Sequence, residues 1–438
     1  MRTLPLFFVP WTTFSQPCSV EAALEKRPLK FLLFIPVMAC LACSGLAGLR
    51  VSAQSRSALD RAHAAAIALD QQGRSTEAEA AWRDILKSHP HDPEALAQVG
   101  VHEARLEHYS EAVTYYRQAL AIAPSFPQLE LNLGLAYFKN KQFKEAIPCF
   151  SHELHRHPGD LRLTILLGMS HYGAGDYAGA VPWLQQAADK DSNNLTLRMT
   201  LAESCLWSKH YQCVMDDYKK ILEIDPNSAP ADMLAGEALD QMGDNAGALA
   251  QFEAAVKANP KEPNAHFGLA YLLLTQKRFS DAVPEFQADL EADPAHAQAR
   301  VYLADCYMHL NDNDHAQPEL ERALRDDSAI ELGHLDLGII YAAQGRNDAA
   351  LEQYRAAMKL NPNDADVHWR LSRLYQAMGQ TDKAREEAAL VSKMKKQAYQ
   401  SLYQQISGAG DAKHRAEQNS SDGSNPSGPP SGPPSTQP

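Results

Sequence analysis

Three histidines crowd one short stretch of the sequence: His152, His155 and His157. Imidazole nitrogens are common ligands of zinc and copper, and two residues three apart share one face of a helix. The spacing differs from the His-Glu-x-x-His pattern of metalloprotease helices. The stretch therefore allows a surface metal site, which would make the protein a metal-responsive or regulatory subunit. The other interpretation is that histidines near the C-terminus of a helix complement its dipole.

Two further features resemble chemical motifs. Residues 173–179 contain three glycines, as phosphate-binding loops do, but they follow an expected helix instead of a strand, so we discard that interpretation. The chain has seven cysteines, and Cys205 and Cys213 flank an expected turn. They could pair across it in an oxidising compartment. Alternatively they are small packing residues, as we expect for Cys149 and Cys306.

All of these side chains lie in a part of the sequence that repeats the same pattern every 34 residues. Stepping by 34 residues reaches Pro90, Pro124, Pro158, Pro226, Pro260, Pro294 and Pro362, with Ser192, Ser328 and Lys396 at the three other positions of the series. The register runs without insertion through residues 59–398, which makes ten units, and residues 132–158 within the third unit show its two short amphipathic helices and closing proline. A fixed period of this length is typical of stacked helical hairpins.

Each unit repeats the same packing pattern. Position 8 holds only small residues, namely Ala66, Gly100, Gly134, Gly168, Ala202, Gly236, Ala270, Ala304, Gly338 and Ser372. Position 20 is alanine in every unit except the fifth, where it is Val214, and position 24 is usually aromatic. Small residues let the two helices of a hairpin approach, since a bulky one would cost about 1–3 kcal/mol by overpacking. Glycines such as Gly175 and Gly243 mark the turn between them.

These small positions, aromatic positions and closing prolines resemble the tetratricopeptide repeat (TPR) family. The resemblance implies an all-α, right-handed superhelical solenoid of ten helix-turn-helix units, whose first helices line a concave groove for a peptide or helix of a partner protein. On this chain the family's inward positions select Leu131, Leu135, Phe138, Met169, Tyr172, Met199, Glu203, Trp207, Glu237, Phe267, Tyr271 and Asp305. Aromatic and methionine side chains suit an apolar or amphipathic peptide, and the three acidic residues favour a basic residue on it.

Charge and domain organisation argue against a nucleic-acid-binding protein and against an enzyme. A formal net charge of −13 argues against broad nucleic-acid binding, which needs a basic face. Only the two ends of the chain lie outside the repeat register, so there is little room for a catalytic domain. We therefore predict a non-enzymatic interaction scaffold without a cofactor. Apolar residues of the first helices could instead pack against the neighbouring unit, which is the competing interpretation of the groove.

The N-terminal segment predicts export. Residues 1–25 form a leader that is consistent with a misassigned start site, and residues 26–53 follow as a signal peptide or membrane anchor. Three outcomes stay open for the uncharged run at 31–49: cleavage after Ala53, a lipid on Cys40, or an uncleaved membrane span. Each outcome places the repeats in the periplasm or cell envelope, where a role in envelope assembly or secretion would fit.

The C-terminal end contains two further expected segments. Residues 391–406 keep a helical pattern with several lysines and read as a polar capping helix. Residues 407–438 are rich in serine, glycine and proline, which predicts a disordered tail.

Overall fold

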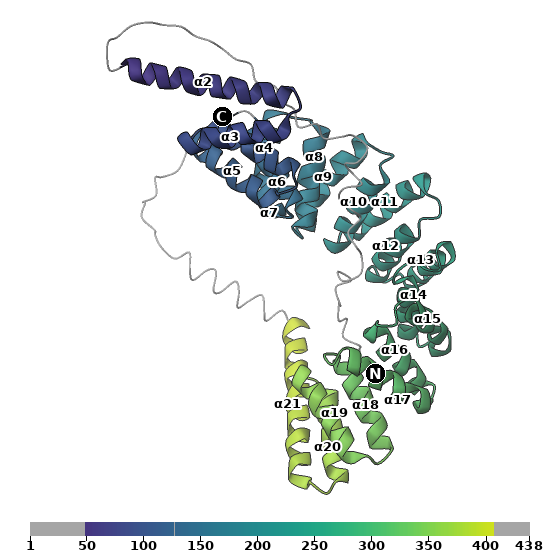
Figure 1. Ribbon diagram of the computed structural model, residues 1–438. Helices are drawn as coiled ribbons and strands as arrows, with labels where there is room; N and C mark the ends of the chain where they lie inside the picture. Colours follow the sequence, from purple (N-terminus) through teal and green to yellow (C-terminus); the bar gives the residue numbers. More distant parts are fainter. Residues whose placement is uncertain (1–48, 127, 407–438) are drawn as a thin grey trace, which may run out of the picture. The chain divides into compact units, whose positions relative to one another are not determined.

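The computed structural model describes residues 49–126 and 128–406, and the regular elements within them are twenty helices (Figure 1). The helices alternate as the first and second members of ten hairpins, which confirms the all-helical repeat architecture. The first helices are α2 (Leu49–Gln71), α4 (Pro93–Arg105), α6 (Leu129–Lys139), α8 (Leu161–Gly173), α10 (Leu195–Trp207), α12 (Ala229–Gln241), α14 (Ala265–Thr275), α16 (Ala297–His309), α18 (Glu331–Ala343) and α20 (Ala365–Ala377).

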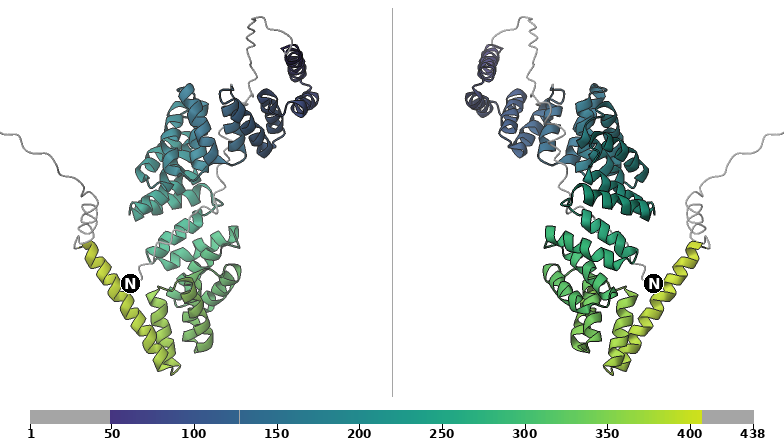
Figure 2. Two further views of the ribbon diagram at one scale, coloured as in Figure 1. Left: turned by 90° about the vertical axis from the view of Figure 1, so that its left-hand side faces the viewer. Right: turned by 90° about the vertical axis from the view of Figure 1, so that its right-hand side faces the viewer.

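The second helices are α3 (Ser75–Ser88), α5 (Tyr109–Ile122), α7 (Phe143–Arg156), α9 (Tyr177–Lys190), α11 (Tyr211–Ile224), α13 (Asn245–Ala258), α15 (Phe279–Ala292), α17 (Asn313–Asp326), α19 (Asn347–Leu360) and α21 (Thr381–Ile406). The chain divides into two compact units, Met1–Leu272 and Leu273–Pro438. From α3 to α12 in the first unit and from α15 to α21 in the second, the second helix of one hairpin contacts the first helix of the next, and Figure 2 shows the stacked hairpins from two further sides.

The small residue at position 8 makes room for the aromatic ring at position 24. A Cβ atom added to Gly100 would lie 2.6 Å from a ring carbon of Tyr116, and one added to Gly338 would lie 2.5 Å from Tyr354. Tyr116 is fully buried and Tyr354 nearly so. The expected close approach of the helices is therefore a ring of the second helix seated on the backbone of the first, and larger side chains at position 8 would displace it.

The turn between the two helices has the same backbone geometry in all ten hairpins. Position 15 lies in the left-handed region throughout, with φ between 72° and 80° at Gly73, Gly175, Gly243, Gly345 and Gly379, and between 58° and 64° at Glu107, Lys141, Lys209, Lys277 and Asn311. The glycines do adopt the helix-ending conformation expected of them. The other five hairpins hold it with residues that pay a steric cost there.

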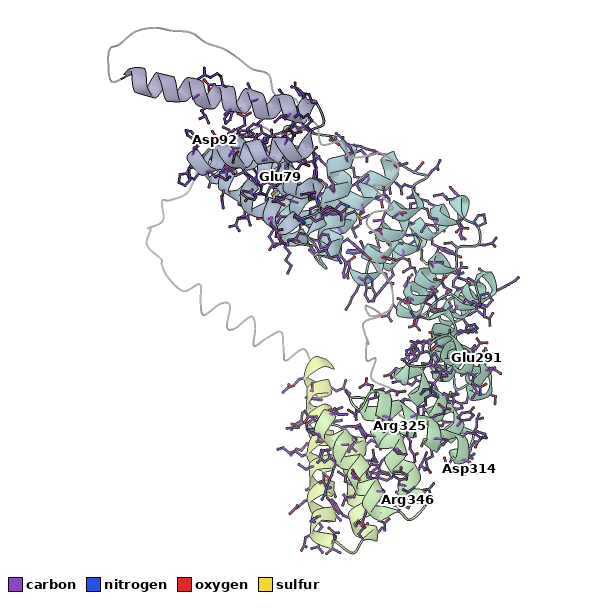
Figure 3. The ribbon with its side chains drawn as sticks, viewed as in Figure 1. Glu79, Asp92, Glu291, Asp314, Arg325 and Arg346 are labelled. Carbon is purple, nitrogen blue, oxygen red and sulfur yellow. A yellow bond between two sulfur atoms is a disulfide. The ribbon has the colours of Figure 1, made fainter. Side chains whose placement is uncertain are left out.

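Aspartate and asparagine side chains begin many of the helices. Asp92, labelled in Figure 3, accepts a hydrogen bond of 2.8 Å from the Ala95 backbone N–H at the start of α4. Asn194 accepts one from the Leu197 N–H at the start of α10. These N-caps satisfy backbone donors that have no partner within the helix.

An arginine or histidine side chain at position 4 joins parts of several hairpins. Arg198 donates through Nη1 to Asp217 Oδ1 at 2.8 Å and through Nε to the Ser192 carbonyl at 2.7 Å. His368 repeats this arrangement with Glu387 and the Pro362 carbonyl. The residue thus ties its own second helix to the loop that closes the preceding unit. Sequence reasoning missed this contact.

The last helix is longer than the repeat predicts. Lys396 stands where most units have proline, and α21 continues through it to Ile406. Residues 391–406, predicted as a capping helix that overlaps the last unit, are helical and form the C-terminal part of α21. At the other end, α2 begins at Leu49, ahead of the predicted first unit.

Several predictions concern residues outside the described parts of the chain. They are the leader, most of the apolar run at 31–49 with Cys40, and the tail at 407–438. In the described residues, no helix is both long enough and apolar enough to cross a membrane.

Candidate functional site

The residues predicted to line the groove divide into buried and partly exposed groups. Phe138, Met169, Met199 and Asp305 are buried, with exposed fractions of 1–6%. Phe138 packs edge-on against Phe143, with ring centroids 5.4 Å apart, so its side chain belongs to the core. For Phe138, Met169 and Met199, which belong to hydrophobic clusters, the structure favours the packing interpretation, whereas Asp305 is a buried carboxylate 3.6 Å from His309.

The other eight predicted residues keep partial exposure on the first helices. We call the surface that they form the first-helix face: Leu131, Leu135, Tyr172, Glu203, Trp207, Glu237, Phe267 and Tyr271. They belong to α6, α8, α10, α12 and α14, at register positions that recur on the same side of each first helix.

Three aromatic rings meet on this face. Tyr172, near the end of α8, lies edge-on to Tyr177 with ring centroids 5.6 Å apart. Tyr177 begins α9 and lies 6.2 Å from Trp207, the last residue of α10. Side chains from three successive helices thus form one aromatic cluster, and all three are partly exposed. Sequence reasoning missed Tyr177, because it considered only first helices.

Three partly buried carboxyl side chains, Glu203, Glu237 and Asp240, lie on α10 and α12, and Glu203 contacts the aromatic cluster. We call them the carboxylate cluster. Tyr172 connects the two clusters, since its hydroxyl donates to Glu203 Oε2 at 2.5 Å. Glu203 is on α10, while Glu237 and Asp240 are on α12, and these two helices contact each other. Asp240 occupies one of the repeat positions that face inward in the family, so the sequence pattern could have identified it as a groove residue.

Burial raises the pKa of all three carboxyl groups, and neighbouring negative charge adds to the rise at Glu237. Burial, together with the charges of Asp240 and Glu203, raises the pKa of Glu237 to about 8. Burial also raises the pKa of Asp240, and that of Glu203 despite the hydrogen bond from Tyr172. In the part of the chain that the structure describes, none of the three forms an ion pair with a lysine, arginine or histidine. The cluster is therefore an uncompensated acidic site.

Tyr271 continues the face on α14. Burial and the charge of Asp240 raise the pKa of its hydroxyl. Phe267 lies one turn earlier, with its ring stacked 6.4 Å from that of Tyr271.

The histidine stretch does not converge on one point. His152 donates to Glu130 at 2.6 Å, and His155 donates to the Ser151 carbonyl at 2.6 Å. His157 lies 3.9 Å from Glu153. Among residues 49–126 and 128–406, no group of three or more histidine, cysteine or acidic side chains could hold a metal ion. The metal-responsive alternative therefore has no support here.

Cys205 and Cys213 form a disulfide, which joins the two helices of the fifth hairpin. This decides between the two interpretations that the sequence left open for them. Cys149 and Cys306 are free and buried, as expected of packing residues. Burial raises the pKa of the Cys149 thiol to about 11 and that of Cys306 to about 12, so neither forms a reactive thiolate at neutral pH.

The structure is an array of paired helices, and side chains of successive first helices form one surface. This arrangement is typical of helical-repeat proteins. Models of the tetratricopeptide repeat match residues 63–127, 131–194 and 233–290, a further one matches 273–332, and a TPR repeat model matches 338–379. The chain belongs to the tetratricopeptide repeat family. None of the curated proteins matches it.

Solved structures with the same type of repeat resemble parts of the chain. YrrB, titled "a TPR protein with an unusual peptide-binding site", is 20% identical over 43% of this chain and 97% of its own, with a TM-score of 0.37. PilF of Pseudomonas aeruginosa is 16% identical over 49% and 99%, with a TM-score of 0.43. MamA of Desulfovibrio magneticus RS-1 is 22% identical over 38% and 95%, with a TM-score of 0.36.

Proposed function

We propose that this protein is a non-enzymatic scaffold that binds a peptide or helix of a partner protein on its first-helix face. TPR domains bind protein or peptide partners. The observation that carries the proposal is that aromatic and carboxylate side chains from four successive first helices, α8, α10, α12 and α14, stay partly exposed at register positions on the same side of each helix. Large partly exposed aromatic side chains are the usual anchors of protein interfaces.

The scaffold works outside the cytoplasm, in the periplasm or cell envelope, and takes part in envelope assembly or secretion. Two observations support this location. The disulfide between Cys205 and Cys213 suits an oxidising compartment, since cytosolic proteins rarely keep structural disulfides. The basic residues, uncharged run and small residues of 26–53 have the order of an export signal.

Partner capture tests the binding proposal. Residues 54–438 are immobilised and exposed to cell-envelope extract, next to a Tyr172→Ala/Trp207→Ala variant. These side chains are partly exposed, so the variant should keep its helical circular dichroism, whereas Phe138→Glu would disrupt the core. A partner retained by the native chain and lost by the folded variant supports the proposal. Equal retention by both contradicts it.

Fractionation of the source cells tests the location. We expect the protein in the envelope fraction, with an intact mass lower than that of the reduced protein by two hydrogen atoms. The N-terminal residue distinguishes the three fates of the leader: Gln54 indicates cleavage, an acylated Cys40 indicates lipidation, and a retained run at 31–49 indicates an anchor. A fully reduced protein confined to the cytosol contradicts the proposal.

A further inference from the structure

We infer that the first-helix face of repeats four to seven selects a lysine or arginine side chain in the bound segment, and that binding of this cation displaces a proton from the carboxylate cluster. The inference rests on the proposed function and adds the chemistry of the ligand. It joins the aromatic cluster of Tyr172, Tyr177 and Trp207 to the carboxylate cluster of Glu203, Glu237 and Asp240.

The first argument is charge. Three carboxylates on two neighbouring helices interact with one another, and within the described chain they have no cation to compensate them. Glu237 makes no hydrogen bond there either, while Glu203 accepts one from Tyr172 and Asp240 only a long one of 3.5 Å from Gln241. A partner cation would supply the donors that these oxygens lack. Charge complementarity therefore favours a basic segment over an acidic or uncharged one.

The second argument is the aromatic surface beside those charges. A lysine or arginine side chain carries an aliphatic stem and a cationic end, and the stem can lie on apolar surface while the charge reaches a polar group. The faces of tyrosine and tryptophan rings also attract cations directly. Because Tyr172 hydrogen-bonds to Glu203, a cation at that carboxylate would lie within reach of the aromatic cluster. An acidic side chain would be repelled at the same place.

The third argument concerns protons. The charged groups that act on Glu237 are Glu203, on the contacting helix α10, and Asp240, three residues further along α12, and neither is cationic. In the free protein, the raised pKa of about 8 keeps Glu237 largely protonated at pH 7. A cation nearby favours the ionised carboxylate and lowers this pKa again. Binding at neutral pH should consequently release a proton, and affinity should increase as pH rises towards 8.

A positional peptide array tests the inference. Immobilised dodecapeptides carry one defined residue at a central position, varied over all amino acids, between randomised flanks. The purified chain should be retained about tenfold more strongly where that residue is lysine or arginine than where it is aspartate or glutamate. The test variant is Glu203→Gln/Glu237→Gln. The control is Glu223→Gln/Glu253→Gln, which removes the same charge from exposed positions on α11 and α13.

The outcomes separate the inference from the proposed function. Loss of the basic preference in the test variant, with its retention in the control, supports the inference. Equal retention of lysine and glutamate peptides overturns it but leaves the scaffold proposal intact, as does a basic preference that survives in the test variant. Retention by none of the peptides overturns both.

The pH dependence of a selected lysine peptide gives a second test. Its affinity for the native chain should rise about tenfold or more between pH 6 and pH 8, because the proton on Glu237 competes with the cation. The Glu237→Gln variant should lack this rise. An affinity that is constant with pH in the native chain would overturn the displacement of a proton.

Discussion

Asp217 and Glu237 are carboxylates that the fold withdraws from water, yet only Asp217 has cations beside it. Arg198 Nη1 lies 2.8 Å from Asp217 Oδ1, and Lys220 Nζ lies 3.8 Å from the same oxygen. Glu237 faces two further carboxylates and has no cation near it among the described residues. The two sites lie in neighbouring repeats. Asp217 is on α11 and pairs with an arginine of the first helix α10, whereas Glu237 is on the first helix α12.

The difference separates structural acids from those available to a ligand. A buried carboxylate is costly unless it is paired, and the chain pairs Asp217 through an arginine that also fastens the loop before its repeat. Glu237, on the first-helix face, has no such partner among the described residues, so the cost of its burial is not offset. We infer that the missing cation belongs to the partner.

Removing the internal cation should have the largest effect. Arg198→Ala leaves Asp217 buried without its main partner, and we expect it to destabilise the first compact unit by about 3–5 kcal/mol. Urea unfolding followed by circular dichroism measures this loss. Arg162→Ala, at an exposed position, is the control and should change little. If Arg198→Ala were equally mild, Asp217 would not need its partner and the comparison would lose its basis.

Neutralising Glu237 should have the opposite effect. Its pKa is raised on folding, so the folded chain binds the proton more tightly and loses stability as pH rises from about 4.5 to about 8. Glu237→Gln removes that penalty and should stabilise the chain by about 2 kcal/mol at pH 9, with little change at pH 4. Urea midpoints at both pH values measure the difference. A destabilised variant at pH 9 would mean that Glu237 is satisfied within the fold.

His368 provides a titratable version of the internal pair. Burial opposes its charge, but hydrogen bonds to Glu387 and the Pro362 carbonyl raise its pKa above the usual value of 6.5. The stability from this charge is present in full below pH 6.5 and disappears as pH rises through the raised pKa. His368→Gln should therefore cost about 1 kcal/mol at pH 6 and less at pH 9. Equal losses at both pH values would contradict a charged pair.

The smallest effect should come from the turns. Lys209 holds a φ of 64° where Gly175 holds 75°, so Lys209→Gly should relieve strain and stabilise the fifth hairpin by about 0.5 kcal/mol. Gly175→Lys should cost a similar amount. Thermal unfolding of the two variants measures both changes. Lower stability of Lys209→Gly would show that contacts of the lysine side chain outweigh its backbone strain.

The sequence predicted the hairpins well because each 34-residue repeat corresponds to one helix-turn-helix unit. Residues 59–398 keep one register, and small residues at position 8 identified where an aromatic ring such as Tyr116 must fit. Residues 391–406 were predicted to be helical, and α21 does continue to Ile406, because Lys396 replaces the helix-stopping proline. Ser192 lacks proline as well, yet α9 ends at Lys190.

The site was less predictable because it depends on contacts between neighbouring units. Register positions selected Tyr172, Glu203 and Glu237, but could not separate them from Phe138, which points into the core. Tyr177 comes from a second helix and joins the aromatic cluster only through the stacking of hairpins. A period describes what each unit repeats, whereas a binding surface depends on how individual units differ.

The most direct test of the central claim is the number of protons released when a lysine peptide from the array binds. Calorimetric titrations at pH 7 in phosphate and in Tris buffer give that number, because the two buffers take up protons with different heats. We predict net release by the native chain and none by Glu237→Gln. Identical heats in both buffers for the native chain would contradict the claim that a partner's cation replaces the proton on the carboxylate cluster.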